Sequence, residues 1–297
     1  MRLKIFNLGK NDSMNYRECY LDGVNILNEA MVPDAELDTR LLLEFVCKTD
    51  RNTLLVHWDS EVSPKEQSCF YEFISKRAKR IPLQLLTNQQ YFYGLSFYVN
   101  EHVLIPRQDT EILVEQALKL VKPGMKVLDM CTGSGCIIIS MMAMFQKITG
   151  YGVDISNEAI KVAEKNSKEL LPQDYQPVWK SGDLFHAFED EVVPPVFDMI
   201  VSNPPYIPTK DIKDLMPEVK EHEPISALDG SEDGLFFYKN IIRESKTYVT
   251  DDGSLLFEIG YDQGKAVSLL MEEAGYKEVT VIKDYAGLDR VVIGKRK

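Results

Sequence analysis

The segment 125–144 limits the possible folds most strongly, because a strand, a glycine-rich turn and an apolar helix follow one another there without a gap. Residues 125–129 have the apolar run of a buried strand, 131–135 supply the turn, and 137–144 have the length and composition of a buried helix. Strand and helix patterns then alternate as far as residue 275. Such alternation is typical of a largely parallel sheet covered by helices, so we predict an α/β fold.

The later elements follow from the same patterns. We expect strands at 148–153, 178–181, 196–200 and 254–259, and helices at 235–248 and 262–274. Two last strands, at 279–282 and 290–293, are close enough in the sequence to be antiparallel. Residues 218–234 are acidic and contain proline, which predicts an irregular, mobile surface loop.

Helical spacing dominates the residues from about 12 to 80 instead. A helix in this part should carry Leu37, Leu41 and Phe45 on one face. A capping box at 63–66 opens a later helix, which ends in a basic run at 76–80. We interpret this run as a solvated helix end favoured by the helix dipole; the alternative is a patch that faces an anionic partner. A period of two around Gly94 predicts a β-hairpin at 91–99 that connects this part with the rest.

Composition excludes several classes of function. The net charge of −12 gives the chain no general attraction for phosphate backbones, which argues against non-specific nucleic-acid binding. Five cysteines without a repeated metal-ligand spacing indicate free thiols in a reducing compartment, and the four histidines form no cluster, so we expect no metal site. Residues 1–6 are too short and too polar for a signal peptide, and no apolar run has membrane-spanning length. We therefore expect a soluble, cytoplasmic protein.

The glycine-rich turn and three acids together predict a cofactor site. Glycines at 133 and 135 let the backbone approach a ligand, and the amino end of the following helix favours an anionic group. Asp129, Asp154 and Asp183 come at or just after the ends of three successive strands, where they can hold a nucleoside. A dinucleotide fingerprint requires a third glycine or alanine, but position 138 is isoleucine. This favours a smaller nucleoside ligand over NAD, and it disfavours an NAD-dependent oxidoreductase.

A second motif follows the strand at 196–200. Asn203-Pro204-Pro205-Tyr206 ends that strand in a rigid loop, because neither proline can donate a hydrogen bond to a sheet. The Asn203 side-chain oxygen and the Pro204 carbonyl are two fixed acceptors that can hold both N–H bonds of a planar –NH2 group, with Tyr206 as a flat face beside it. A nitrogen held in this way can be oriented toward an electrophile. The alternative is a plain proline-rich turn.

These motifs resemble the HemK/PrmC-type protein methyltransferases, which use S-adenosylmethionine to methylate the glutamine side chain of peptide chain release factors. The lead-in at 103–107, the turn at 129–135 and the loop at 203–206 carry the resemblance, and the closing stretch at 284–292 is also similar. It covers nearly the whole chain. It implies a small helical domain at 1–85 that helps to dock the release factor, a β-hairpin linker at 86–106, and a Rossmann-like, seven-stranded methyltransferase domain at 107–297.

The resemblance also implies the roles of individual residues. The cofactor site would comprise Asp129, Cys131, Thr132, Gly133, Ser134, Gly135, Asp154, Asp183, Leu184 and Asn203. The catalytic residues would be Asn203, Pro204, Pro205 and Tyr206, which hold the glutamine of a Gly-Gly-Gln loop, and Pro106, Arg107 and Glu111 would also contact the substrate. Two positions depart from the family pattern: Gln108-Asp109 replaces Pro-Glu, and Cys131 replaces a glycine, so we expect the Cys131 side chain to point away from the cofactor.

Residues 107–111 could instead have purely structural roles. Arg107 could form a surface ion pair, and Asp109, Thr110 and Glu111 could cap the helix that follows them. Alternative functions also stay open at this point: methylation of a glutamine in a ribosomal protein, methylation of an amino group of adenine in DNA or RNA, or a non-catalytic cofactor-binding module. The intact turn and the intact Asn-Pro-Pro-Tyr argue against the last of these.

Overall fold

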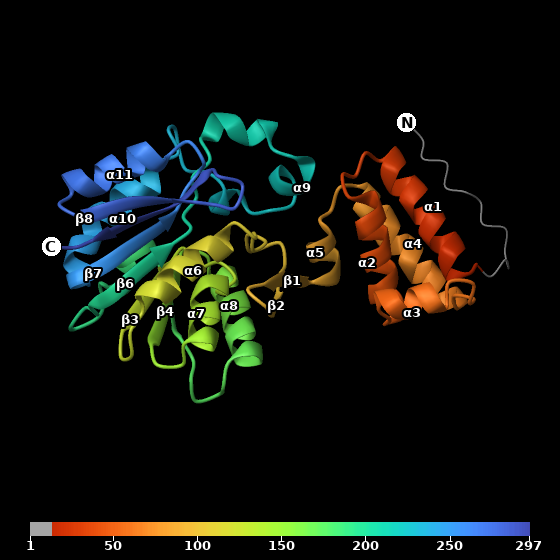
Figure 1. Ribbon diagram of the computed structural model, residues 1–297, viewed down its shortest axis with the longest axis horizontal. Helices are drawn as coiled ribbons and strands as arrows, with labels where there is room; N and C mark the ends of the chain where they lie inside the picture. The colour runs from red at the N-terminus through yellow and green to blue at the C-terminus, as the bar shows by residue number, and fades with distance from the viewer. Residues whose placement is uncertain (1–13) are drawn as a thin grey trace. The chain divides into compact units, whose positions relative to one another are not determined.

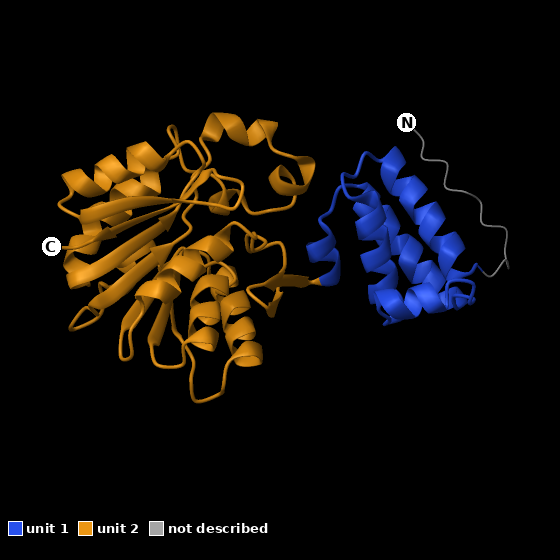
Figure 2. Cartoon of the chain, in the orientation of Figure 1, with its two compact units in different colours: residues 1–87 blue, residues 88–297 orange. Residues whose placement is uncertain are grey.

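The computed structural model describes residues 14–297 and divides the chain into two compact units, residues 1–87 and 88–297 (Figure 2). The expectation for residues 1–6 lies outside the described residues. The division falls close to the expected end of the helical domain at residue 85. The hairpin is grouped with the second unit, and its role as a linker stays a prediction.

The first unit consists of helices (Figure 1). They are α1 (Tyr16–Glu29), α2 (Ala35–Cys47), α3 (Arg51–Val56), α4 (Pro64–Ala78) and α5 (Leu83–Thr87). The predicted capping box of α4 is present: the Ser63 side chain accepts from the Glu66 backbone N–H, and the Glu66 side chain accepts from the Ser63 backbone N–H. Asn15 and Glu18 cap α1 in the same way. Leu27, from α1, is among the residues of the small apolar core.

One expectation about this unit is wrong, and another holds only in part. Leu37 and Phe45 are 46% and 43% exposed, whereas Leu42 of the same helix is fully buried. Helix α2 therefore packs against the core with a different face from the one expected. The physical reason is that Asp38 lies on the buried side, where it forms a 2.6 Å ion pair with Arg77 of α4. Arg77 is therefore buried, so the basic run is not a fully solvated helix end.

The second unit is built on one seven-stranded sheet, preceded by the predicted hairpin of β1 (Gln89–Phe92) and β2 (Leu95–Tyr98) (Figure 1). The sheet has the order β5-β4-β3-β6-β7-β9-β8. Its strands are β3 (Lys126–Met130), β4 (Thr149–Asp154), β5 (Val178–Ser181), β6 (Phe197–Ser202), β7 (Val249–Glu258), β8 (Lys277–Lys283) and β9 (Asp289–Lys295). The first five of these strands pair in parallel, and β9 is antiparallel to both β7 and β8. The predicted fold class and the antiparallel closing pair are thus confirmed.

Helices cover both faces of this sheet (Figure 1). On one face lie α6 (Thr110–Leu120), α7 (Cys136–Met144) and α8 (Asn157–Leu170), and on the other lie α10 (Phe236–Tyr248) and α11 (Gly264–Glu273). Alternation along the strands explains the two layers: Val127 and Val201 pack in the cluster that contains α6 and α7 residues, whereas Leu128 and Ile200 pack with α10 and α11 residues. The sheet therefore presents an apolar face to each layer.

The strand order places a ligand site. The chain runs outward from β3 to β4 and β5, and then returns to add β6 on the other side of β3. Such a reversal leaves a crevice at the carboxyl ends of the strands, where open α/β sheets bind ligands. The residues that follow β3, β4 and β6 carry the predicted site.

Two boundaries differ from the expectation. Strand β7 begins at Val249 rather than at 254, because the exposed Asp251 and Asp252 lie within it and gave no apolar pattern. Residues 218–234 are irregular, as expected, but they do not form a mere surface loop. They include part of the short α9 (Pro217–Lys220) and a 3-10 turn (Ile225–Ala227), and they bury Glu223 and Leu228.

Candidate active site

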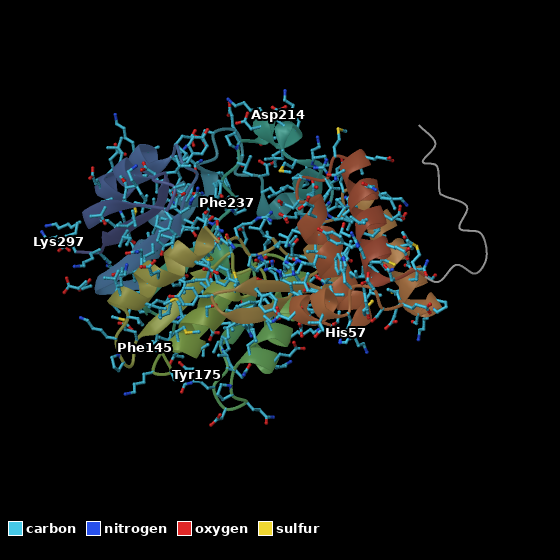
Figure 3. The ribbon with its side chains drawn as sticks, turned by 45° about the vertical axis from the view of Figure 1, so that its right-hand side comes forward. His57, Phe145, Tyr175, Asp214, Phe237 and Lys297 are labelled. Carbon is cyan, nitrogen blue, oxygen red and sulfur yellow. The ribbon has the colours of Figure 1, made fainter. Side chains whose placement is uncertain are left out.

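A cavity opens at the carboxyl ends of β3, β4 and β6, where the strand order places a ligand. Its lining includes Pro106, Arg107, Thr110, Cys131, Thr132, Gly133, Ser134, Asp154, Ser156, Asp183, Leu184, Asn203, Pro205 and Phe237. Figure 3 shows Phe237 in the middle of the second unit, away from Phe145 and Tyr175 at its lower edge. The cavity thus brings together the lead-in, the glycine-rich turn and the Asn-Pro-Pro-Tyr loop, which are far apart in the sequence.

The turn after β3 adopts left-handed backbone geometry at alternate positions. Cys131, Gly133 and Gly135 have φ values of +60°, +54° and +79°. Glycine adopts this region without strain, whereas Cys131 adopts it at a cost because it carries a Cβ. Cys131 packs against the core, although it also lines the cavity.

Two acids hold this turn in place through hydrogen bonds. Asp129 is fully buried, and its Oδ2 accepts hydrogen bonds from the Thr132 hydroxyl (2.6 Å) and the Ile138 N–H (3.4 Å). Burial raises the pKa of Asp129 to about 7. Asp154 accepts from the Gly133 N–H through Oδ2 and from the Ser156 N–H through Oδ1, each at 2.9 Å. Asp154 lines the cavity, whereas Asp129 supports the turn without lining it.

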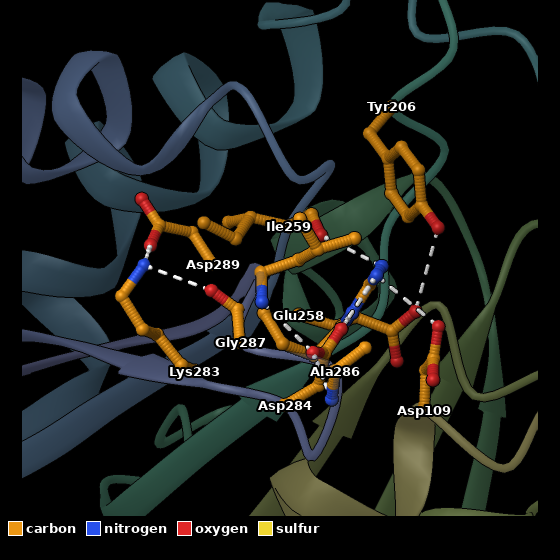
Figure 4. Close-up of polar contacts among 11 residues, drawn as sticks. Asp109, Tyr206, Glu258, Ile259, Lys283, Asp284, Ala286, Gly287 and Asp289 are labelled. Atoms are coloured by element: carbon orange, nitrogen blue, oxygen red, sulfur yellow. Dashed lines mark hydrogen bonds and ion pairs between the residues drawn. The ribbon is translucent and has the colours of Figure 1, made fainter.

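The Asn-Pro-Pro-Tyr loop begins directly after β6. Asn203 donates from Nδ2 to the Thr110 hydroxyl (3.3 Å), and the Tyr206 hydroxyl lies 3.5 Å from Oε1 of Glu258, toward which it points (Figure 4). Burial raises the pKa of Tyr206, so its hydroxyl stays protonated and donates a hydrogen bond to Glu258. Within residues 14–297, neither Asn203 Oδ1 nor the Pro204 carbonyl accepts a hydrogen bond from another residue. Both acceptors are available to a ligand.

Two buried polar residues lie beneath this loop. Glu258 is 1% exposed at the end of β7, and burial raises its pKa to about 7. Gln263 donates from Nε2 to the carbonyls of Tyr206 (3.0 Å) and Gly234 (3.3 Å), and its Oε1 accepts from the Gly260 N–H (2.9 Å). Every polar atom of Gln263 thus has a partner, as a buried amide requires.

The lead-in is held by ion pairs rather than by helix capping. Arg107 Nη2 contacts both carboxylate oxygens of the buried Glu223, at 2.6 and 2.7 Å, so this ion pair is buried on the Glu223 side, while the Arg107 side chain stays 40% exposed. Asp109 makes no side-chain cap for α6 and instead pairs with Arg290 (3.1 Å), contrary to the capping expectation. Arg290 also pairs with Asp284 (3.1 Å). This bridge, drawn in Figure 4, ties Asp109 to the closing stretch at 284–292.

Comparison with known proteins identifies the family. Residues 18–87 match the PrmC N-terminal domain, and residues 121–274 match a methyltransferase domain. A release factor glutamine methyltransferase of Fusobacterium nucleatum is 38% identical over 300 aligned positions, which cover 99% of this chain and 83% of the relative. One of Geobacter sulfurreducens is 39% identical, with 91% of this chain and 92% of the relative covered. The chain belongs to the release factor glutamine methyltransferase family.

Structural comparison agrees on the fold alone. A methyltransferase from Pyrococcus furiosus, 16% identical, superimposes with a TM-score of 0.51 over 75% of this chain and 98% of its own. The Rossmann-like methyltransferase architecture expected from the sequence is therefore present. No helix within residues 14–297 has both the length and the apolar character to cross a membrane, and that same part of the chain holds no cluster of His, Cys, Asp and Glu suited to a metal ion.

Not every residue implied by the family pattern lies on the cavity. Asp129, Gly135, Pro204, Tyr206 and Glu111 are outside its lining. Glu111 instead accepts a hydrogen bond from the Tyr93 N–H (2.8 Å), which ties α6 to the hairpin. The roles of these residues toward ligands stay predictions.

Sequence reasoning missed several residues of this site. The sequence indicates Thr110 only as a possible cap, and it gives no role to Glu258, Gln263, Ser156 or Phe237. Glu258 is an acid inside the apolar run at 255–259, and this signal could have marked it.

Proposed function

We propose that this protein transfers the methyl group of S-adenosylmethionine to N5 of the glutamine in the Gly-Gly-Gln loop of peptide chain release factors. The observation that carries the proposal is the pair of available acceptors, Asn203 Oδ1 and the Pro204 carbonyl, at the carboxyl end of β6. Membership of the family supplies the substrate class, since relatives such as the Fusobacterium and Geobacter proteins are named for it.

The residues present fit the cofactor. Each Asp154 oxygen accepts one backbone hydrogen bond, and a carboxylate has about four lone-pair sites, so Asp154 can accept further bonds from a ribose diol. Gly133 lines the cavity, and a Cβ added to it would meet no atom within 4 Å, so the backbone leaves open space for a ligand there. Asp183 and Leu184 complete this side of the cavity.

Orientation and electrostatics carry the reaction. When bound, S-adenosylmethionine supplies a methyl group attached to a positively charged sulfur. The glutamine nitrogen is a poor nucleophile because its lone pair is delocalised into the carbonyl group. Asn203 Oδ1 and the Pro204 carbonyl would accept its two N–H bonds and place the nitrogen in line with the methyl group. The same acceptors stabilise the positive charge that develops on nitrogen, an interaction that is stronger in the transition state than in the ground state. In the transfer, the bond from nitrogen to the methyl carbon would form as the bond from that carbon to sulfur breaks, and the nitrogen would then release one proton to solvent water.

Methyl transfer to three parallel substrates tests the proposal. Labelled S-adenosylmethionine is offered with a release factor, with the same factor carrying alanine in place of the loop glutamine, and with double-stranded DNA. We expect label only on the intact factor. Label on DNA would refute the expected lack of DNA binding, and no label on either factor, with the cofactor still bound, would direct attention to the ribosomal-protein substrate.

Substitution of Asn203 tests the mechanism separately. Asn203→Ala removes one acceptor but leaves the backbone of the turn and Asp154 untouched. We expect turnover to fall by at least about a hundredfold, as for loss of one preorganised transition-state contact, while cofactor affinity stays within a few-fold of the wild type. Near-normal turnover would refute this role.

The expected cytoplasmic location stays a prediction.

A further inference from the structure

Asn166 of α8 joins two parts of the second unit that are distant in the sequence. The residue is fully buried, and its side-chain amide bonds strand β2 as well as the turn that follows β3. Its Oδ1 accepts from the Tyr98 N–H (2.7 Å), and its Nδ2 donates to the carbonyls of Tyr98 (3.0 Å) and Ser134 (2.9 Å). A primary amide has two N–H donors, so both are used. Nothing in the mechanism above uses Asn166.

The Ser134 carbonyl depends on this amide. Regular helical bonding at the start of α7 would bring the Ile138 N–H to that carbonyl, but the Ile138 N–H points to Oδ2 of Asp129 instead (3.4 Å). Among the described residues, no backbone N–H donates to the Ser134 carbonyl, and Asn166 Nδ2 does so in its place. Ser134 is buried, and a buried carbonyl without a donor is costly. The peptide group that joins Ser134 to Gly135 is therefore held by α8.

Apolar packing connects α8 with the same two parts. A small cluster joins α8 to the residues that follow β2; it consists of Val99, Val103, Ala159 and Val162, with Tyr98 packed against it. On the side of the turn, a Cβ added to Gly135 would lie 3.2 Å from the Cβ of Ala163, which precedes Asn166 on α8. Helix α8 thus contacts both the cofactor turn and the hairpin through its packing as well as through the Asn166 amide.

We propose that Asn166 is a positioning residue that holds the cofactor turn at Ser134 and couples it to strand β2. The inference deepens the proposed function and rests on it for the identity of the cofactor. Asn166 acts through the turn, because it is fully buried and lies outside the cavity lining. Coupling of this kind is reciprocal: the bonds of Asn166 strengthen cofactor binding, and a bound cofactor makes the bonds at Tyr98 open less often.

Calorimetric binding of S-adenosylhomocysteine, the demethylated form of the cofactor, tests the first half of this coupling. Asn166→Ala removes every bond of the amide. Ser245→Ala is the control, because it removes a buried hydroxyl that bonds Tyr276 (2.6 Å), and neither of these residues lines the cavity. Both variants should lose stability in urea unfolding. We expect Asn166→Ala to weaken binding at least about fivefold, the effect of one lost hydrogen bond, and Ser245→Ala to change it less than about twofold.

Two results of this experiment would overturn the inference. An Asn166→Ala protein with wild-type affinity would show that the turn does not need the amide. A Ser245→Ala protein that binds as weakly as Asn166→Ala would show that loss of stability alone explains the effect.

Hydrogen exchange measured by NMR in the wild type tests the second half, whether or not the variant folds. Two backbone N–H groups of the hairpin region are each held by one side chain: that of Tyr98 by Asn166, and that of Tyr93 by Glu111 (2.8 Å). We expect S-adenosylhomocysteine to slow exchange at Tyr98 at least about threefold more than at Tyr93, and this difference to vanish in Asn166→Ala. Equal slowing at both positions in the wild type would contradict the coupling.

Failure of this inference differs from failure of the proposed function. An active wild type with equal slowing at Tyr98 and Tyr93 would refute the inference alone. A wild type that binds S-adenosylhomocysteine but does not methylate the release factor would refute the proposed function alone, and one that does not bind it would refute both.

Discussion

Alanine at two glycines of the cofactor turn should have opposite main effects, one on stability and one on ligand binding. Both Gly133 and Gly135 have positive φ, which costs an alanine about 1–2 kcal/mol, partly offset by about 0.5–1 kcal/mol from the stiffer unfolded chain. A Cβ at Gly135 would lie 2.8 Å from Ile139 and 2.9 Å from the Trp179 ring, whereas a Cβ at Gly133 would meet nothing within 4 Å. Overpacking adds about 1–3 kcal/mol at Gly135 alone.

We therefore expect Gly135→Ala to lower the free energy of unfolding by about 2–4 kcal/mol and Gly133→Ala by about 1 kcal/mol, measured by urea unfolding followed by circular dichroism. Cofactor affinity should fall more in Gly133→Ala than in Gly135→Ala. The methyl group added at Gly133 enters space beside the cavity, so Gly133→Ala should weaken S-adenosylmethionine binding at least tenfold in calorimetry. A Gly133→Ala protein as destabilised as Gly135→Ala, or with unchanged cofactor affinity, would refute this reasoning.

Three further changes test the supports of the site. Arg107→Ala and Glu223→Gln should raise the KM for the release factor equally, and the double variant should be no worse; additive losses would show that Arg107 contacts the substrate independently of Glu223. Gln263→Glu replaces the donor to the Tyr206 carbonyl with an oxygen, so urea unfolding should show a loss of about 1–3 kcal/mol, and an unchanged midpoint would contradict this. Burial raises the pKa of Glu258 from 4.5 to about 7, so its folded form holds a proton that the unfolded chain releases, and stability falls as pH rises through that range. The free energy of unfolding of the wild type, relative to that of Glu258→Gln, should therefore be higher at pH 5.5 than at pH 8. The same difference at both pH values would contradict the raised pKa.

The sequence predicted the layers of the fold because periodicity reports which side of each element is buried. It located the turn at 131–135 and the loop at 203–206, since glycine and proline restrict the backbone locally. It failed on α2, where an apolar stripe through Leu37 competed with another through Leu42, and the buried ion pair of Asp38 with Arg77 decided between them. Periodicity treats such an aspartate as a surface residue.

Polar contacts between distant segments could not be predicted in the same way. Asn203 and Thr110 are 93 residues apart, and Arg107 and Glu223 are 116 apart. A local sequence pattern contains no information about such pairs, so the sequence indicates Thr110 only as a possible cap. Cys131 illustrates a different limit: the resemblance implies a glycine at this position, but the left-handed φ of +60°, which would suit a glycine, is seen only in the structure.

The chemistry of the Asn-Pro-Pro-Tyr loop explains why it needs these distant contacts. Two successive prolines remove two backbone donors, so the loop has few hydrogen bonds of its own with which to hold its shape. Thr110, Glu258 and Gln263 come from three other elements, and each fixes a different group of the loop: the Asn203 amide, the Tyr206 hydroxyl and the Tyr206 carbonyl. The prolines keep the Pro204 carbonyl available for a substrate, and the surrounding side chains supply the rigidity that catalysis by orientation requires.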